Sequence, residues 1–221
     1  TPPPPPPPRH GVRRQRQMCI RDRSGLVLKL AHQGCDCGNE RRWFDLLPEV
    51  TPATLASGTA LLVRWGGPGS EVQSLRLSYI VVEKVTLLKD YLQGRGHVPG
   101  LLALQAAVIS WAAWAGLNLR DVGQSNWGCR VSDSGDLRDI LLIDGGSWET
   151  WRHLQFPNRR RAAGYWSWAR CQDADLADEM WHLVQVSSQQ LEPIFDGIMY
   201  ILQSRYPAMF HMASRQLRLP E

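Results

Sequence analysis

The sequence predicts an α+β fold in two parts, a β-rich first part and a mainly helical second part. Short apolar runs bounded by turn residues dominate up to residue 83, whereas longer segments with helical periodicity dominate beyond it. The pattern changes at residues 83–85, so we expect the first part to span residues 25–84 and the second residues 85–221. With 221 residues, 43% of them hydrophobic, the chain is long enough to bury one good core or two small ones.

Residues 1–24 are expected to stay outside the fold as a disordered tail. Residues 2–8 are an unbroken proline run, which has no amide donors and adopts an extended polyproline II conformation. Residues 15–23 resemble a peptide that arises when sequencing adapter is translated together with a transcript. We therefore expect this tail to be artefactual and the native N-terminal portion to be truncated.

Three strands and one helix are expected in the β-rich part. Residues 25–30 read as a short apolar strand that carries one lysine, Lys29. Residues 40–47 place apolar side chains at helical spacing. Two further strands, residues 60–65 and 75–82, flank a turn rich in glycine and proline.

The second part begins with a short helical segment and then a long apolar run, residues 101–117. A membrane span needs roughly 20 apolar residues, and this run is shorter and contains Gln105 and Ser110. It therefore predicts a buried helix and no membrane association. Residues 127–131 and 139–144 read as a β-hairpin, and helical periodicity returns afterwards, most clearly in residues 174–186 and 191–203.

Charge and cysteine content narrow the functional class. The net charge is +4, but residues 1–23 contribute +5, so the rest of the chain sums to −1 and lacks the basic character of nucleic-acid binders. The five cysteines are odd in number and follow no secretory signal, and only Cys35 and Cys37 are close in sequence. We expect free thiols, no zinc site, and an intracellular protein of the cytoplasm or nucleus.

Two polar motifs carry the candidate chemistry. Asp121 and Asn126 follow the apolar helix, and Asp144 ends an apolar strand before two glycines. Carboxylate and amide oxygens suit Mg²⁺, and a separate carboxylate can orient an attacking hydroxyl, so the pattern favours phosphoryl transfer. Taken singly, each motif also fits a loop cap or an ordinary strand-ending turn.

These motifs resemble those of protein kinases. Arg120-Asp121 with Asn126 is similar to the catalytic loop His-Arg-Asp-x-x-x-x-Asn, and residues 143–146, Ile-Asp-Gly-Gly, are similar to the metal-binding Asp-Phe-Gly. Residues 26–29, Leu-Val-Leu-Lys, resemble the strand whose lysine contacts the phosphates of ATP. Residues 79–83 resemble the hinge segment between the lobes, and the resemblance covers roughly residues 25–150.

The resemblance implies a two-lobed protein-kinase-like fold, with a partial β-rich N-lobe and a mainly helical C-lobe. It also implies an ATP- and Mg²⁺-dependent phosphotransferase acting on Ser/Thr hydroxyls of proteins. The implied roles are a catalytic base, Asp121; magnesium ligands, Asn126 and Asp144; a phosphate-contacting lysine with its partner, Lys29 and Glu40; and nucleotide-lining hinge residues, Val82, Glu83 and Val85. Apart from the resemblance, Lys29 also fits an exposed strand lysine and Glu40 a carboxylate that complements the helix dipole.

The sequence departs from the kinase pattern at several points. Leu119 replaces the catalytic-loop histidine, Gly145 replaces the phenylalanine of Asp-Phe-Gly, and no Gly-x-Gly-x-x-Gly precedes Lys29. No Ala-Pro-Glu follows Asp144. These departures leave two alternatives open: a catalytically impaired pseudokinase or scaffold, and a small-molecule kinase of the same fold.

Overall fold

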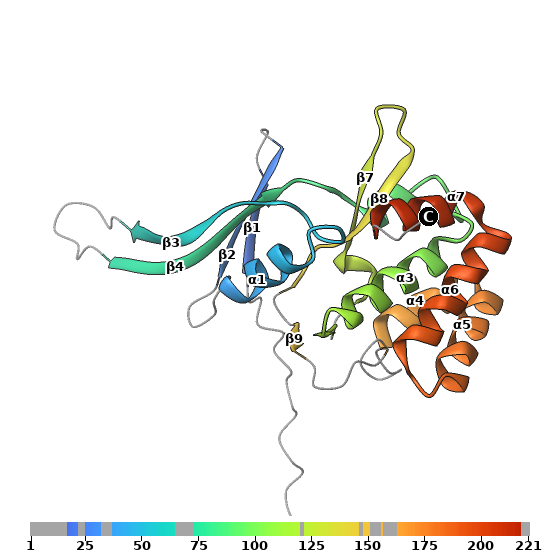
Figure 1. Ribbon diagram of the computed structural model, residues 1–221. Coiled ribbons are helices and arrows are strands. Elements are labelled where there is room, and N and C mark those ends of the chain that lie inside the picture. The colour runs from blue at the N-terminus through green and yellow to red at the C-terminus, as the bar shows by residue number, and fades with distance from the viewer. Residues whose placement is uncertain are drawn as a thin grey trace, which may run out of the picture.

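An antiparallel sheet and a bundle of helices lie side by side, joined through a β-hairpin (Figure 1). The computed structural model describes residues 17–21, 25–31, 37–64, 73–119, 122–145, 148–150, 156 and 163–217. The predicted α+β class, with strands first and helices after them, is confirmed by this arrangement.

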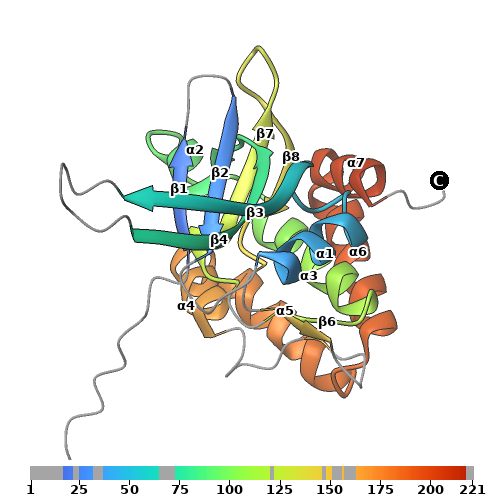
Figure 2. The same ribbon diagram turned by 90° about the vertical axis from the view of Figure 1, so that its left-hand side faces the viewer.

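The sheet of the first part has four antiparallel strands in the order β1-β2-β4-β3. β2 (Leu26–Ala31) lies between β1 (Gln17–Arg21) and β4 (Gln73–Glu83), and β3 (Thr54–Arg64) forms the far edge. Val27 pairs with Val82, and Lys29 pairs with Ile80. Both views show the β3–β4 ribbon projecting beyond β1 and β2 (Figures 1 and 2). Helix α1 (Gly38–Leu46) packs against the sheet and buries Trp43 and Phe44.

β1 lies within the segment that the sequence predicts to be a tail. The backbone of Gln17–Arg21 pairs with β2, from Gln17 opposite Ala31 to Arg21 opposite Val27. The rest of residues 1–24 lies outside the described residues. An unpaired strand edge offers a row of backbone donors and acceptors that an extended segment can satisfy, which gives a physical reason for this pairing. Whether the segment is artefactual stays a prediction, as does the division of the chain at residues 84 and 85.

A small second sheet, ordered β5-β7-β8, connects the two parts. β7 and β8 form the predicted hairpin, and Gly135, with φ of +83°, allows its turn to close. The strands and the short helix beside them are β5 (Thr86–Leu87), η1 (Gln124–Asn126), β7 (Trp127–Val131) and β8 (Leu137–Leu142). A separate pair of strands is formed by β6 (Leu117–Asn118) and β9 (Glu149–Thr150).

The helical part is organised around α3 (Leu101–Trp114), which is buried on almost every side. A helix that is apolar all round can be stable in water only when other elements surround it, and α6 and α7 both contact α3. In the part of the chain that the structure describes, no helix is long and apolar enough to cross a membrane. The remaining helices are α2 (Leu88–Leu92), α4 (Ala163–Gln172), α5 (Ala174–Val186), α6 (Leu191–Arg205) and α7 (Pro207–Gln216).

Candidate functional site

Lys29 and Glu40 form a buried ion pair between the sheet and helix α1. The Lys29 Nζ atom lies 2.5 Å from Glu40 Oε1, and the two side chains are only 8% and 0% exposed. Lys29 is on β2, which has a neighbouring strand on each side, so it is not an exposed edge lysine. Because Glu40 is fully buried, it also differs from a solvated carboxylate that complements the helix dipole.

The same ion pair contacts the backbone on both sides of Asp144. Lys29 Nζ donates a hydrogen bond to the carbonyl oxygen of Ile143 at 2.6 Å. The amide of Gly145 donates to Glu40 Oε1 at 3.3 Å. The ring of Phe44 lies below the ammonium, 5.3 Å from Nζ to the ring centroid, and adds a cation–π contact. Strand β2 and helix α1 therefore meet a segment more than 100 residues further along the chain, next to the residue that is predicted to bind metal.

Asn126 and Asp144 are brought together by the base of the β7–β8 hairpin. The amide of Ile143 donates to the carbonyl oxygen of Asn126 at 3.0 Å, which continues the strand pairing of Trp127 with Leu142 by one step. Asn126 is 8% exposed, and its Oδ1 atom accepts a hydrogen bond from Ser125 Oγ at 3.3 Å.

These two residues fit one kind of metal ion. Protein sites for Mg²⁺ commonly supply only one or two oxygen ligands, and water and phosphate complete the coordination. The amide of Asn126 and the carboxylate of Asp144 come from neighbouring backbone positions and would supply such a donor set. In the described segments, no group of three or more His, Cys, Asp or Glu side chains could hold a metal ion.

Asp121, the predicted catalytic base, lies outside the described residues, as does Arg120. The residues on either side of this pair, Leu119 and Val122, are both buried. Leu119 thus keeps an apolar contact at the position where protein kinases have histidine. The carbonyl of Val122 accepts a hydrogen bond from Trp127 Nε1 at 3.1 Å, which ties this segment to the start of β7.

The packing around residue 145 explains why a glycine is found there. A Cβ atom on Gly145 would lie 3.2 Å from Phe44 Cε1 and 3.3 Å from Trp148 Cε3, so even alanine would be crowded. The rings of Phe44 and Trp148 have centroids 6.2 Å apart and fill this space. Trp148 is held in turn by α1, because Asn39 Nδ2 donates to its carbonyl oxygen at 3.0 Å. Aromatic side chains from two other positions therefore occupy the volume next to Gly145.

The three predicted hinge residues lie at the junction of the two sheets. Val82 is buried in β4. The side chains of Val85 and Ile143 close over Gly128 of β7: a Cβ atom on Gly128 would lie 2.6 Å from Val85 Cγ2 and 2.7 Å from Ile143 Cγ2. Val85 is thus close to the strand end that leads into Asp144.

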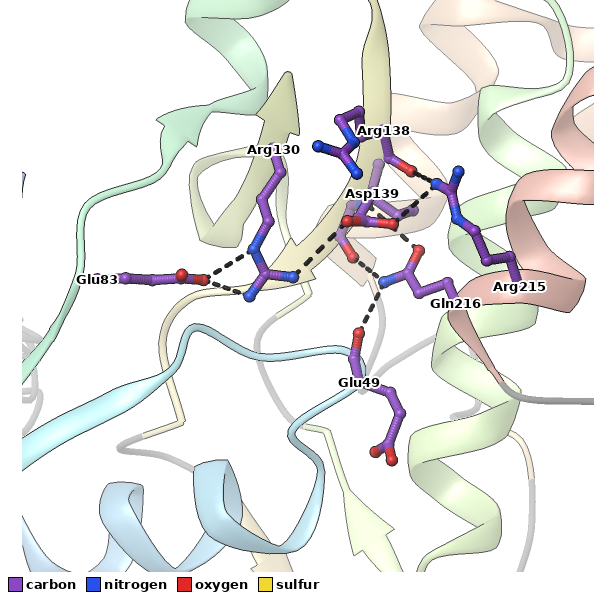
Figure 3. Close-up of polar contacts among 8 residues, drawn as sticks. Glu49, Glu83, Arg130, Arg138, Asp139, Arg215 and Gln216 are labelled. Carbon is purple, nitrogen blue, oxygen red and sulfur yellow. Dashed lines mark hydrogen bonds and ion pairs between the residues drawn. The ribbon is translucent and has the colours of Figure 1, made fainter. Parts of the chain in front are cut away.

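The third hinge residue, Glu83, belongs to a chain of charged contacts that ends on α7 (Figure 3). Glu83 Oε1 accepts hydrogen bonds from Nε of Arg130, at 3.0 Å, and from its Nη2. Arg130 Nη1 lies 3.7 Å from Asp139 Oδ2, and Asp139 Oδ1 lies 3.1 Å from Nη2 of Arg215. The side chain of Glu83 therefore faces the β7–β8 hairpin.

Gln216, at the end of α7, forms hydrogen bonds that the sequence does not suggest. Its Nε2 atom donates to the carbonyl oxygens of Ile140, at 2.6 Å, and Glu49, at 3.0 Å, and its Oε1 atom accepts from the amide of Ile140 at 3.4 Å (Figure 3). These bonds connect the last helix to β8 and to the loop after α1. The partners lie 76 and 167 residues away, so no local signal could have revealed them.

Cys129, on β7 close to Gly128, is buried and does not resemble a reactive thiol. Burial raises its pKa from 9.0 to about 11, and the charge of Arg95 offsets only part of that effect. A thiol with so high a pKa carries almost no thiolate near neutral pH, so it is a poor nucleophile and metal ligand. Cys129 is therefore not a candidate for the chemistry of this site.

Comparisons with known proteins agree with this geometry at the level of the fold. No family model and no curated protein matches the sequence. Among solved structures, the chain is similar to a divergent kinase lacking the glycine-rich loop, which regulates membrane ultrastructure of the Toxoplasma parasitophorous vacuole. The two share 16% sequence identity with a TM-score of 0.50, and the match covers 88% of this chain and 74% of the other. The chain has a kinase-like α+β fold, as the sequence predicts.

Proposed function

We propose that the protein is an ATP- and Mg²⁺-dependent phosphotransferase of the protein-kinase type, which transfers a phosphoryl group to a Ser or Thr hydroxyl of a protein. The observation that carries the proposal is the Lys29–Glu40 ion pair, whose two ends bond the backbone immediately before and after Asp144. Phosphoryl transfer depends mainly on positioning and charge neutralisation, and this contact fixes a cation beside a potential metal ligand.

Lys29 has the hydrogen-bonding capacity that phosphate binding needs. A lysine ammonium has three donors, and the described contacts of Lys29 use one with Glu40 and one with Ile143. The third donor is left for a phosphate oxygen of the nucleotide. Because Glu40 and Ile143 already orient the side chain, little further conformational entropy would be lost on binding.

Asn126 and Asp144 would hold Mg²⁺, and Asp121 would accept the proton of the attacking hydroxyl. The ion would supply positive charge to the transferring phosphoryl group and its leaving group. The protein contributes the placement of these side chains: the hairpin sets Asn126 beside Ile143, and the ion pair clamps the segment that carries Asp144.

That no Gly-x-Gly-x-x-Gly motif precedes Lys29 in this sequence does not by itself argue against this function. The similar solved structure belongs to a kinase described as lacking that loop, which supports the proposal that such a fold can act without it. In this chain, a lysine held on two sides would compensate in part, because it does not need a covering loop to orient it.

A pseudokinase or scaffold is the second candidate, and one observation favours it. The Lys29 side chain is only 8% exposed. If the ammonium stays bonded to Ile143 and Glu40 alone, it would lock β2, α1 and the Asp144 segment together without contacting a nucleotide. Both candidates share the fold and differ in turnover.

The test is a phosphotransfer assay on the purified full chain with radiolabelled ATP, MgCl₂ and a generic protein substrate, alongside an ATP-binding measurement. The proposal predicts Mg²⁺-dependent incorporation that Asp121→Asn abolishes while ATP binding persists. Binding without incorporation in the unmodified protein would favour the pseudokinase. If the protein shows neither binding nor incorporation at millimolar ATP, the phosphotransferase is rejected and a scaffold that does not contact a nucleotide is favoured.

A further inference from the structure

A pocket of about 700 Å³ opens where the C-terminal ends of α1 and α3 meet α6. None of the candidate nucleotide or metal residues lines it. Its lining consists of Leu46, Leu47, Glu49, Trp111, Trp114, Ala115, Phe195 and Asp196. The volume is in the range of sites that bind small molecules or anchoring side chains.

The pocket is aromatic inside and apolar at its rim. Phe195 is nearly buried, and its ring centroid lies 6.4 Å from that of Trp111 and 6.0 Å from that of Trp114. Trp114 and Leu46 are 44% and 52% exposed. Large apolar side chains that stay in contact with water around a hollow are typical of interaction sites, in which a few buried aromatic contacts supply most of the binding energy.

The charge of the pocket restricts what can bind there. Among the residues that the structure describes, the lining has two carboxylates, Glu49 and Asp196, and no cationic side chain. Asp196 is exposed and forms no ion pair with any other described residue. Anionic ligands, including nucleic acids and acidic lipid surfaces, are therefore disfavoured, and cationic ones are favoured.

We propose that this pocket is a docking site for a basic, apolar segment of a partner protein. A bulky Leu, Met or Phe side chain of the segment enters the pocket against Phe195 and the two tryptophans. A Lys or Arg side chain of the segment lies against Asp196. The pocket is open, and its exposed rim extends across α1 and α3, which suits one anchoring side chain of a longer polypeptide better than a small molecule that must be enclosed.

The proposal is tested by selecting random 12-residue peptides displayed on phage against the immobilised full chain, with counter-selection on a Trp114→Ala variant. Because Trp114 is 44% exposed, we expect Trp114→Ala to keep the fold, and circular dichroism checks this. Enriched peptides are synthesised, and their affinities are measured by fluorescence anisotropy for the unmodified chain, Trp114→Ala and Asp196→Lys. Tyr200→Ala is the matched control, because Tyr200 is on the same helix as Asp196, is 71% exposed and does not line the pocket.

The expected result is a set of peptides that combine a bulky apolar residue with at least one Lys or Arg residue. Trp114→Ala and Asp196→Lys should each weaken their binding at least tenfold, and Tyr200→Ala should leave it within twofold. Enriched peptides without basic residues, or with affinities unchanged by Asp196→Lys, would overturn the charge assignment. No peptide that distinguishes the unmodified chain from Trp114→Ala would overturn the docking site, as would Trp114-dependent self-association detected by light scattering, since a second copy would then cover the pocket.

Discussion

The ammonium of Lys29 lies 2.6 Å from the carbonyl oxygen of Ile143, a residue 114 positions further along the chain. This single contact joins the β-rich part to the segment that carries Asp144. Since Lys29 also pairs with Glu40, sheet, helix α1 and the candidate metal-binding segment share one buried charge cluster. This cluster leads us to predict how substitutions change the stability of the protein and its binding of ATP.

Lys29→Met should destabilise the protein by about 3–5 kcal/mol, because it leaves the Glu40 carboxylate buried without its cation. The double variant Lys29→Met/Glu40→Gln removes both charges and should recover much of that loss. Urea denaturation followed by tryptophan fluorescence measures both. If the single and double variants were equally stable, the buried carboxylate of Glu40 would not need the Lys29 ammonium to offset its charge.

Gly128→Ala should cost about 1–3 kcal/mol, because the added methyl group would lie well inside contact distance of Val85 and Ile143. Combining it with Val85→Ala creates room on one side and should restore part of the stability. Thermal unfolding of the two variants and of Val85→Ala alone gives the coupling energy. Purely additive effects would contradict the close approach of these side chains.

Gln216→Ala should destabilise the chain by about 1–3 kcal/mol, since it leaves the buried backbone groups of Ile140 without their partners. The neighbouring Arg215→Ala removes an ion pair from a side chain that is 59% exposed, and should cost at most about 1 kcal/mol. Chemical denaturation of the two variants compares them directly. A larger loss in Arg215→Ala would show that the charged contacts, and not the amide bridge, hold α7 in place.

Alkylation should separate Cys171 from Cys129. Cys171 is exposed on α4, whereas Cys129 is fully buried with a pKa raised to about 11. With iodoacetamide at pH 8.5, we expect Cys171 to be labelled at least tenfold faster, because the thiolate is the reactive form and Cys129 stays protonated. Peptide mass spectrometry over a time course measures both rates. Comparable rates would mean that β7 opens frequently to solvent.

Local patterns predict much of the fold. The apolar run predicts α3, although the helix ends at Trp114 and not at residue 117. Residues 174–186 coincide with α5, and the two apolar runs at 127–131 and 139–144 predict the β7–β8 hairpin, although its second strand is Leu137–Leu142. In each case neighbouring residues fix the structure through periodicity or turn chemistry, so no information about distant contacts is needed.

The candidate site is harder to predict from the sequence than the helices and strands, because its residues come from distant positions in the chain. Lys29 and Glu40 are indicated only by the resemblance to protein kinases, because hydrophobic periodicity does not distinguish them from other residues. The contact of Arg130 with Glu83 and those of Gln216 with Ile140 and Glu49 have no local signal, since these partners are at least 47 residues away. Nor does the sequence indicate that Trp148 packs beside Gly145, where kinases have their phenylalanine.

The most direct test of the central claim is isothermal titration calorimetry of ATP binding to the full chain with and without Mg²⁺, comparing the unmodified protein with Asp144→Asn. If Lys29, Asn126 and Asp144 form one nucleotide site, binding should require Mg²⁺, and Asp144→Asn, which keeps the size of the side chain, should weaken it at least tenfold. Mg²⁺-independent binding, or equal affinity in Asp144→Asn, would contradict the assignment of Asp144 as a metal ligand.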